Sequence, residues 1–283
     1  MSVPITAIVL TWNEAENLEP CLASLAWVDE LFVVDSGSTD ATLAIAERFG
    51  ARVVHHDFAT HSAQWAWALG ELPITHPWVL GLDADQRVTP ELAAELAERF
   101  PTPDGPAGVD GCFVKRRQIF RGKWIRHGGY YPKYLLKLFR RSAVTFDAAD
   151  LMDHHFYVAG PTAKLRNDIV EDNRKEHDIT FWIDKHNRYA RLHAREERMR
   201  RAGAGWELEP KLTGSPDQRV VWLKQRWYRM PLFVRPALYF GLRYFVQLGF
   251  LDGKQGFIFH FLHAFWYRLL VDIHLDDPEP PRV

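Results

Sequence analysis

The sequence predicts an α/β fold whose sheet is mostly parallel and carries helices on both faces. Between Val3 and Phe100, short apolar runs rich in β-branched residues alternate with segments whose apolar residues recur at helical spacing. The turns after these runs are rich in Asp, Ser, Thr and Asn, as expected where parallel strands end and ligands bind. With 283 residues and 47% hydrophobic content, the chain can bury a full core.

Four strands and four helices are predicted before the Pro101–Gly108 loop. The strands are Val3–Leu10, Leu31–Val34, Ala51–Val54 and Trp78–Leu82, and the helices are Leu18–Leu25, Ala41–Phe49, His61–Leu69 and Pro90–Phe100. Gly50 is a C-cap, and Thr89 is an N-cap before a proline at the first helical position. After the loop, the pattern predicts strand-like pieces at Cys112–Lys115 and Leu135–Phe139, then a long polar helix over Asp178–Met199.

Cysteine usage and the N-terminus indicate a cytoplasmic protein. Cys21 and Cys112 are too few for a disulfide framework and form no CxxC pair, so we expect two small core residues in a reducing compartment. The first residues lack the basic and apolar regions of a secretory signal. No window reaches the roughly 18 uncharged apolar residues of a spanning helix.

The C-terminal third combines cations with aromatic residues. The net charge of −1 argues against nucleic acid as a partner, yet Gln218–Leu251 contains six basic residues and no acidic one. Such a composition predicts a helical region, 216–275, that associates with an anionic membrane at the inner face of the cell membrane. The alternative is that its aromatic side chains complete the core or a homo-oligomer interface. The tail, 276–283, is expected to be disordered.

The sequence Asp83-Ala84-Asp85 directly follows an apolar strand. Two carboxylates one residue apart, where the backbone turns, can direct oxygens at one divalent cation, and such oxygens suit Mg²⁺ or Mn²⁺. A cation of this kind also binds substrate phosphates, so the turn predicts a diphosphate site. Acidic pairs are also common in solvated turns, which is the alternative interpretation.

A second polar turn, Asp35–Asp40, follows the second strand. Gly37 permits a tight backbone there, and Asp35 can accept a hydrogen bond from a nucleobase N–H or a ribose hydroxyl. For Ser38, Thr39 and Asp40 we expect a capping turn at the start of the next helix.

These motifs together resemble a known family. TWNEAENLEPCLASL after the first strand, VVDSGSTDAT after the second and LDAD after the fourth are similar, in order and spacing, to family-two glycosyltransferases of the GT-A fold. The similarity is greatest to bacterial lipopolysaccharide-core and exopolysaccharide transferases. It implies a GT-A domain over 1–215, with a nucleotide-sugar half (1–100) and an acceptor half (101–215), that performs metal-dependent, inverting transfer.

The resemblance also implies roles for individual residues. Thr11, Asn13 and Glu14 would line the nucleotide pocket, Asp35 would contact the base, and Gln64 would lie near the donor diphosphate. Asp83 and Asp85 would hold Mg²⁺ or Mn²⁺, with Asp83 on the ribose side. The base is usually uracil in this family, so a UDP-sugar is the expected donor.

An inverting transfer needs a base that takes the proton of the acceptor hydroxyl. Relatives place a glutamate at the position that here holds His154, so either Asp153 or His154 is the candidate base. The predicted acceptor is a saccharide or a lipid-linked saccharide of cell-surface polysaccharide or lipopolysaccharide biosynthesis.

Other interpretations remain open at this stage. One is a catalytically impaired, nucleotide-binding membrane adaptor, and another is a nucleotidyltransferase, which also uses paired carboxylates on a parallel sheet. Lys133, Arg140 and Arg141 either contact phosphate or an anionic acceptor, or are solvated at the surface.

Overall fold

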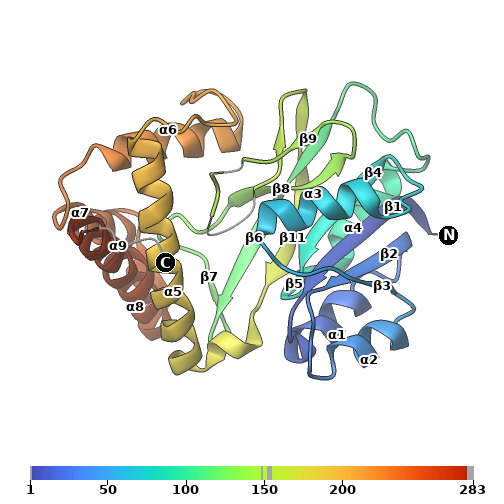
Figure 1. Cartoon of the computed structure of the whole chain (residues 1–283), viewed down its shortest axis with the longest axis horizontal. Helices are drawn as coiled ribbons and strands as arrows, with labels where there is room; N and C mark the ends of the chain where they lie inside the picture. The colour runs from blue at the N-terminus through green and yellow to red at the C-terminus, as the bar shows by residue number, and fades with distance from the viewer. Residues whose placement is uncertain (1, 148, 152–154, 279–283) are drawn as a thin grey trace.

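The structure is a computed structural model that describes residues 2–147, 149–151 and 155–278. A central nine-stranded sheet lies between helices on its two faces, and a group of C-terminal helices lies at one end of the molecule (Figure 1). Helices α1, α2 and α4 contribute to the core on one face, and α3 contributes to the core on the other. The predicted fold class is therefore confirmed.

The first half of the chain alternates strands and helices as predicted. Its elements are β1 (Val3–Thr11), α1 (Ala15–Ala23), β2 (Val28–Asp35), α2 (Thr42–Arg48), β3 (Arg52–His55), α3 (His61–Glu71), β4 (Trp78–Asp83), β5 (Gln86–Val88) and α4 (Pro90–Arg99). The predicted caps are present: Thr89 Oγ1 accepts a hydrogen bond from the Leu92 amide, and Gly50 has a φ of +69° after α2.

The second half of the chain extends the same sheet with mixed strand directions. Its elements are β6 (Gly111–Phe120), β7 (Lys123–Ile125), β8 (Lys133–Arg140), β9 (Val144–Thr145), β10 (Tyr157–Val158), β11 (Thr162–Glu171) and the 3₁₀ turn η1 (Arg174–His177). The order is β3-β2-β1-β4-β8-β6-β11-β5, and the ninth strand, β7, pairs with β6 outside this path. Strands β9 and β10 form a separate two-stranded sheet. The strands β3, β2, β1 and β4 are parallel, β8 is antiparallel to both its neighbours, and β11 is parallel to β6.

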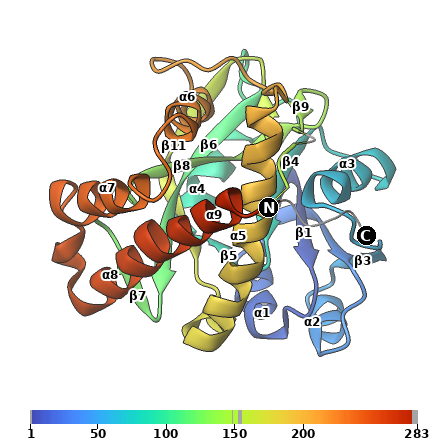
Figure 2. The ribbon, with the colours of Figure 1, turned by 60° about the vertical axis from the view of Figure 1, so that its left-hand side comes forward.

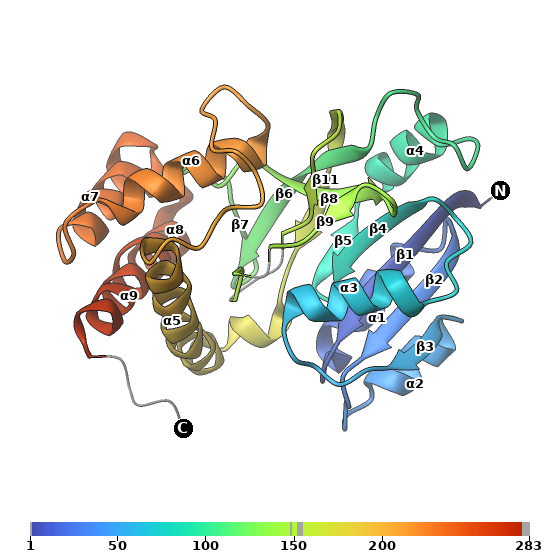
Figure 3. The same ribbon diagram turned by 45° about the horizontal axis from the view of Figure 1, so that its top comes forward.

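The sheet curls so that its last strand returns toward β4. Only Ala84 and Asp85 separate β4 from β5 in the chain, although β8, β6 and β11 lie between them in the sheet. The Val88 amide of β5 donates to Ser24 Oγ at the end of α1, so β5 is near the first half of the molecule (Figure 3). The acidic turn therefore lies where the two halves of the sheet meet.

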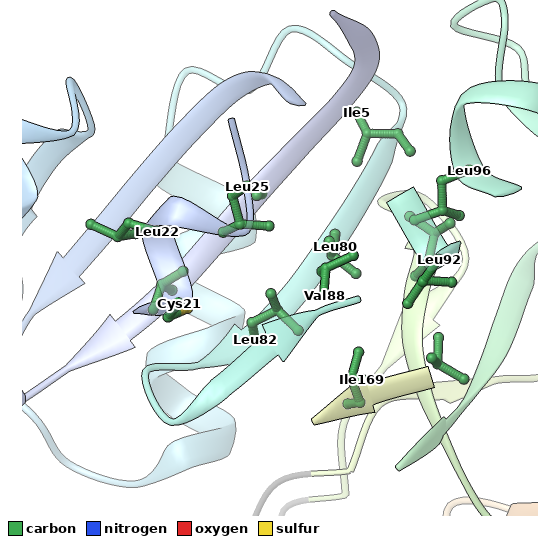
Figure 4. Close-up of a cluster of buried hydrophobic side chains, with 14 of the residues drawn as sticks. Ile5, Cys21, Leu22, Leu25, Leu80, Leu82, Val88, Leu92, Leu96 and Ile169 are labelled. Atoms are coloured by element: carbon green, nitrogen blue, oxygen red, sulfur yellow. The ribbon is translucent and has the colours of Figure 1, made fainter. Parts of the chain in front are cut away.

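The core under α1 and α4 shows why the first half folds locally. Leu22 and Leu25 of the α1 region and Leu92 and Leu96 of α4 pack on alternate residues of the strands (Figure 4). Cys21 and Cys112 are both buried and unlinked, as predicted for small core residues.

The C-terminal helices form a separate layer. They are α5 (Ile179–Arg201), α6 (Pro216–Tyr228), α7 (Arg235–Gly241), the π-helical turn η2 (Leu242–Val246), η3 (Gly249–Asp252), α8 (Gly253–His260), η4 (Phe261–Trp266) and α9 (Tyr267–Asp276). Helix α5 packs against α9 (Figure 2). Among the described residues, no helix has the length and apolar character needed to span a bilayer. The division at residue 215 stays a prediction.

A buried ion cluster holds this layer together. Arg235 is fully buried and donates to Glu197 of α5 and Asp272 of α9, which are also fully buried. We expect Arg235→Met to lower the free energy of unfolding by about 3–5 kcal/mol, because two buried carboxylates would lose the cation that they share. Of their partners in the described part of the chain, Glu197 would keep Arg201, and Asp272 would keep only the Phe233 amide. Urea titration measures this change. Arg229→Met, at an exposed position, is the control and should change the free energy of unfolding very little. Equal losses of stability in the two variants would contradict a stabilising role for the buried ion cluster.

Candidate active site

The carboxyl ends of three parallel strands meet at one edge of the sheet. In register, Thr11 pairs with Asp35 of β2, and Leu10 pairs with Asp83 of β4. The ends of β1, β2 and β4 therefore bring the three predicted motifs together, as the sequence predicted.

The acidic turn is surrounded by charge. Asp83 Oδ2 accepts from Lys137 Nζ at 3.1 Å, and Lys137 is itself a buried side chain of β8. Desolvation, together with the carboxylates of Glu171 and Asp83, raises the pKa of Asp85 well above its usual range. Glu171 is held by Arg116, whose guanidinium contacts both carboxylate oxygens at 2.9 and 3.1 Å. Ionised Asp85 thus lies in excess negative potential, which a bound cation would neutralise.

The residues of the turn fit a Mg²⁺ or Mn²⁺ ion shared with a substrate. In the described part of the chain, no three His, Cys, Asp or Glu side chains are grouped closely enough to hold a metal alone. Mg²⁺ normally needs only one or two protein carboxylates and completes its octahedral shell with phosphate oxygens and water. Asp83 and Asp85 would hold such an ion.

Asp35 has a structural role in this state. Its Oδ1 accepts from the hydroxyls of Thr11 and Ser38, and its Oδ2 accepts from the amides of Gly37 and Ser38. These four bonds use the acceptor capacity of a carboxylate, so a nucleobase would have to replace one of them. The predicted capping role of Asp40 is confirmed, because its Oδ1 accepts from the Thr42 amide at the start of α2.

The first loop is fixed from two sides. Asn13 has a φ of +52°, and its side-chain oxygen accepts from the Thr39 amide at 2.8 Å. On the other side, Lys175 Nζ donates to the Asn13 carbonyl at 3.1 Å and to Glu14 Oε1 at 2.6 Å. Asn13 and Glu14 thus form a rigid wall beside the strand ends, which suits the predicted pocket.

Gln64 links the ends of β2 and β3. Its amide nitrogen donates to Ser36 Oγ and to the His56 carbonyl, and its oxygen is 2.6 Å from His56 Nδ1. Gln64 is buried and its amide group is bonded to Ser36 and His56. Its proximity to the donor diphosphate stays a prediction.

The structure places three lysines near the acidic turn, a position that the sequence did not predict for them. Lys137 contacts Asp83, Lys175 contacts Glu14, and Lys185 pairs with Glu176 and lowers the pKa of Asp85 through its charge. They belong to β8, η1 and α5, elements far apart in the sequence. Lysines so placed can stabilise the negative charge of a diphosphate.

Arg140 and Arg141 do not belong to this site. Arg140 pairs with Trp78 at the amino end of β4, the edge opposite Asp83. Its guanidinium donates to the carbonyls of Val109 and Asp104, and Arg141 donates to those of Leu69 and Gly70. The prediction that these two arginines contact donor phosphate is wrong: they hold loops at the other end of the sheet.

The candidate bases Asp153 and His154 lie outside the described residues. The residues on either side of them are joined: Tyr157 donates to Asp150 Oδ2 at 2.8 Å, and His155 Nδ1 is 3.4 Å from the same oxygen. Burial raises the pKa of Asp150, but its interactions with His155 and Tyr157 outweigh that effect and hold it below the usual value. Arg200 of α5 donates to Asp150 and to Asp147, which anchors this junction.

Comparison with known proteins finds a family and several relatives that this chain resembles. The family described as Glycosyl transferase family 2 matches residues 6–160. The lipopolysaccharide core biosynthesis glycosyltransferase LpsC of Rhizobium meliloti is 26% identical over 93% of this chain and 91% of its own length. An uncharacterized glycosyltransferase of Rickettsia felis is 39% identical, but over only 34% of each chain.

Solved structures with detectable similarity are more distant. Glucosyl-3-phosphoglycerate synthase of Mycobacterium tuberculosis is 18% identical, with a TM-score of 0.46 over 72% of this chain and 82% of that one. TarS of S. aureus is 13% identical, with a TM-score of 0.43 over 96% of this chain and 89% of that one.

Proposed function

Because the chain belongs to the glycosyl transferase family 2, we propose that it is a metal-dependent, inverting hexosyltransferase. The proposed donor is a nucleotide sugar, with UDP as the expected nucleotide. The proposed acceptor is a saccharide or lipid-linked saccharide of bacterial lipopolysaccharide or surface polysaccharide, because the LpsC relative is a glycosyltransferase of lipopolysaccharide core biosynthesis. The enzyme would work in the cytoplasm, peripherally associated with the inner face of the cell membrane.

One observation carries this proposal: an acidic turn at the carboxyl edge of the sheet, surrounded by lysines. Asp83 and Asp85 would supply oxygens on the donor side, and Lys137 donates to Asp83. A Mg²⁺ or Mn²⁺ ion bound there supplies electrostatic stabilisation of the leaving nucleoside diphosphate. A nucleotidyltransferase would normally need a glycine-rich, cationic loop after the first strand, where this chain has Trp12-Asn13-Glu14.

In the proposed reaction, the acceptor hydroxyl attacks the donor sugar directly. Asp153 or His154 would take the proton of the acceptor hydroxyl. The acceptor oxygen bonds to the anomeric carbon while the bond from that carbon to the diphosphate oxygen breaks, so the configuration inverts. Lys137 and Lys185 would stabilise the charge that develops on the diphosphate side.

A donor screen tests the proposal. We expect nucleoside diphosphate release from UDP-sugars in the presence of Mn²⁺ and acceptor, but little from GDP- or dTDP-sugars. Excess EDTA should reduce the rate by at least about 100-fold, because the diphosphate would lose its counter-charge. An unchanged rate in EDTA would contradict metal dependence.

Other products would identify the alternative functions. Calorimetric binding of UDP and Mn²⁺ without transfer to any saccharide would indicate the nucleotide-binding adaptor. Release of pyrophosphate from a nucleoside triphosphate and a sugar phosphate would indicate a nucleotidyltransferase.

A further inference from the structure

Large apolar side chains are exposed together on the C-terminal helices. Phe245 and Val246 are 61% and 72% exposed, and Leu238 and Leu251 are 56% and 54% exposed. We call this set the apolar face; it comprises Leu238, Leu242, Phe245, Val246, Leu248, Phe250, Leu251, Phe257 and Phe261. Contiguous exposed apolar surface of this kind marks an interaction site.

The apolar face is one side of a helical hairpin, in which α7 and η2 form one arm and α8 and η4 form the other. Leu238, Leu242, Phe245 and Val246 recur at the spacing of one helix face along α7 and η2. Helix α7 packs against η4, and η2 packs against η3 and α8. The rings of Phe245 and Phe261 both contact Phe240, which joins the two arms of the hairpin.

The exposed charges of residues 218–275, the segment that carries the apolar face, have one sign. All of residues 218–275 are described, and their only carboxylates, Asp252 and Asp272, are buried. Asp252 accepts from the amides of Arg126 and His127, and Asp272 pairs with Arg235. The exposed charged side chains of this region are all basic: Arg219, Arg226, Arg229 and Lys254.

We propose that the apolar face inserts into the headgroup and upper acyl region of an anionic phospholipid leaflet. An exposed face of Phe and Leu, in a helical segment whose exposed charges are all basic, has the composition of an interfacial membrane element. Residues 235–246 span roughly 18 Å as a helix, too short for a hydrocarbon core of about 30 Å. The hairpin is therefore expected to enter one leaflet only. This inference rests on the peripheral membrane association proposed above and names the residues that make it.

The same charge pattern disfavours a second copy of the chain as the occupant. A symmetric dimer would place each apolar face, with its border of cations, against the identical surface. Lys254, which lies between Leu251 and Phe257 in the chain, would then approach a surface of like charge, and no exposed carboxylate of residues 218–275 is present to pair with it. Anionic lipid headgroups supply the missing negative charge.

The hairpin is fixed to the transferase sheet. Asp252 accepts from His127 Nδ1 as well as from two backbone amides, and the Gln247 carbonyl accepts from the Gly128 amide. Gly128 lies in the loop between β7 and β8, and β8 carries Lys137. Insertion of the hairpin would therefore set the orientation of the candidate active site toward the membrane.

Vesicle flotation tests this inference on the full chain. Phe245→Asp combined with Val246→Asp places two charges in the centre of the apolar face without disturbing buried groups. Leu43→Asp combined with Ala44→Asp, two adjacent exposed residues of α2, is the matched control. With vesicles of phosphatidylcholine and phosphatidylglycerol, we expect the face variant to lose at least about tenfold in partitioning and the control to bind like wild type. Vesicles of phosphatidylcholine alone should bind the wild type less well.

Three results would overturn the inference. The first is that the wild type binds neither kind of vesicle, and the second is that wild type and face variant bind equally well. The third is that the wild type is a dimer, the face variant is a monomer, and neither protein binds vesicles. Vesicle binding needs neither donor nor acceptor, and calorimetry with UDP and Mn²⁺ on the same samples reports the nucleotide site. A failed membrane inference is thus distinguishable from a failed transferase proposal.

Discussion

Asp85→Asn is expected to lower sugar transfer by at least about 100-fold while making the unliganded protein more stable. Asparagine has nearly the same shape but carries no charge, so the cation and the diphosphate lose an ionic ligand. Without metal, the same change removes a desolvated carboxylate from beside Glu171 and Asp83, which raise its pKa. If Asp85 only held the turn together, Asp85→Asn would make the unliganded protein less stable instead of more stable.

The pH dependence of stability gives an independent check. Folding raises the pKa of Asp85, so its stabilising contribution is complete below the unfolded-state pKa and is lost as the pH rises through the folded-state pKa. Asp85→Asn has no carboxyl group to ionise at this position, so its stability does not fall in this way as the pH rises. In EDTA, the difference in Tm between variant and wild type should therefore widen from acidic toward neutral pH.

Asp184→Asn, at an exposed position of α5, is the control for Asp85→Asn. It should leave both transfer and Tm unchanged. Full activity of Asp85→Asn, or a lower Tm in EDTA, would remove Asp85 from the proposed metal site.

The strand and helix pattern of the first half was predictable because each element carries its own burial signal. The continuous apolar run that begins at Val3 and the Thr89–Pro90 cap are local features, and the structure keeps them as the buried strand β1 and the start of α4. The second half was less predictable, because burial periodicity does not specify strand partners. β11 was missed, and β6 extends to Phe120, beyond the predicted Lys115.

In the candidate site, too, the local features were predictable from the sequence and the long-range contacts were not. The acidic turn and the Asp35 turn are contiguous in sequence, and parallel pairing brings them to one edge. Lys137 and Arg200 reach the site only through tertiary packing, as members of a mostly buried strand and a long polar helix. No local pattern distinguishes such a lysine or arginine from a solvated one.

Substitution of the catalytic base should lower kcat by about 10²–10⁴-fold. The candidates are Asp153 and His154, to be tested as Asp153→Asn and His154→Gln. The neighbouring junction in which Arg200 binds Asp147 and Asp150 is predicted to stay intact in both variants. UDP binding should therefore persist, and the loss should appear in kcat rather than in KM.

The pH profile of kcat/KM distinguishes the two candidates. A base acts only when deprotonated, so the rate rises with pH through about 6.5 if His154 is the base and through about 4 if Asp153 is. His155→Gln is the matched control: His155 contacts Asp150, so its loss should affect stability more than the rising limb. If both variants at 153 and 154 kept wild-type rates and profiles, the base would lie elsewhere.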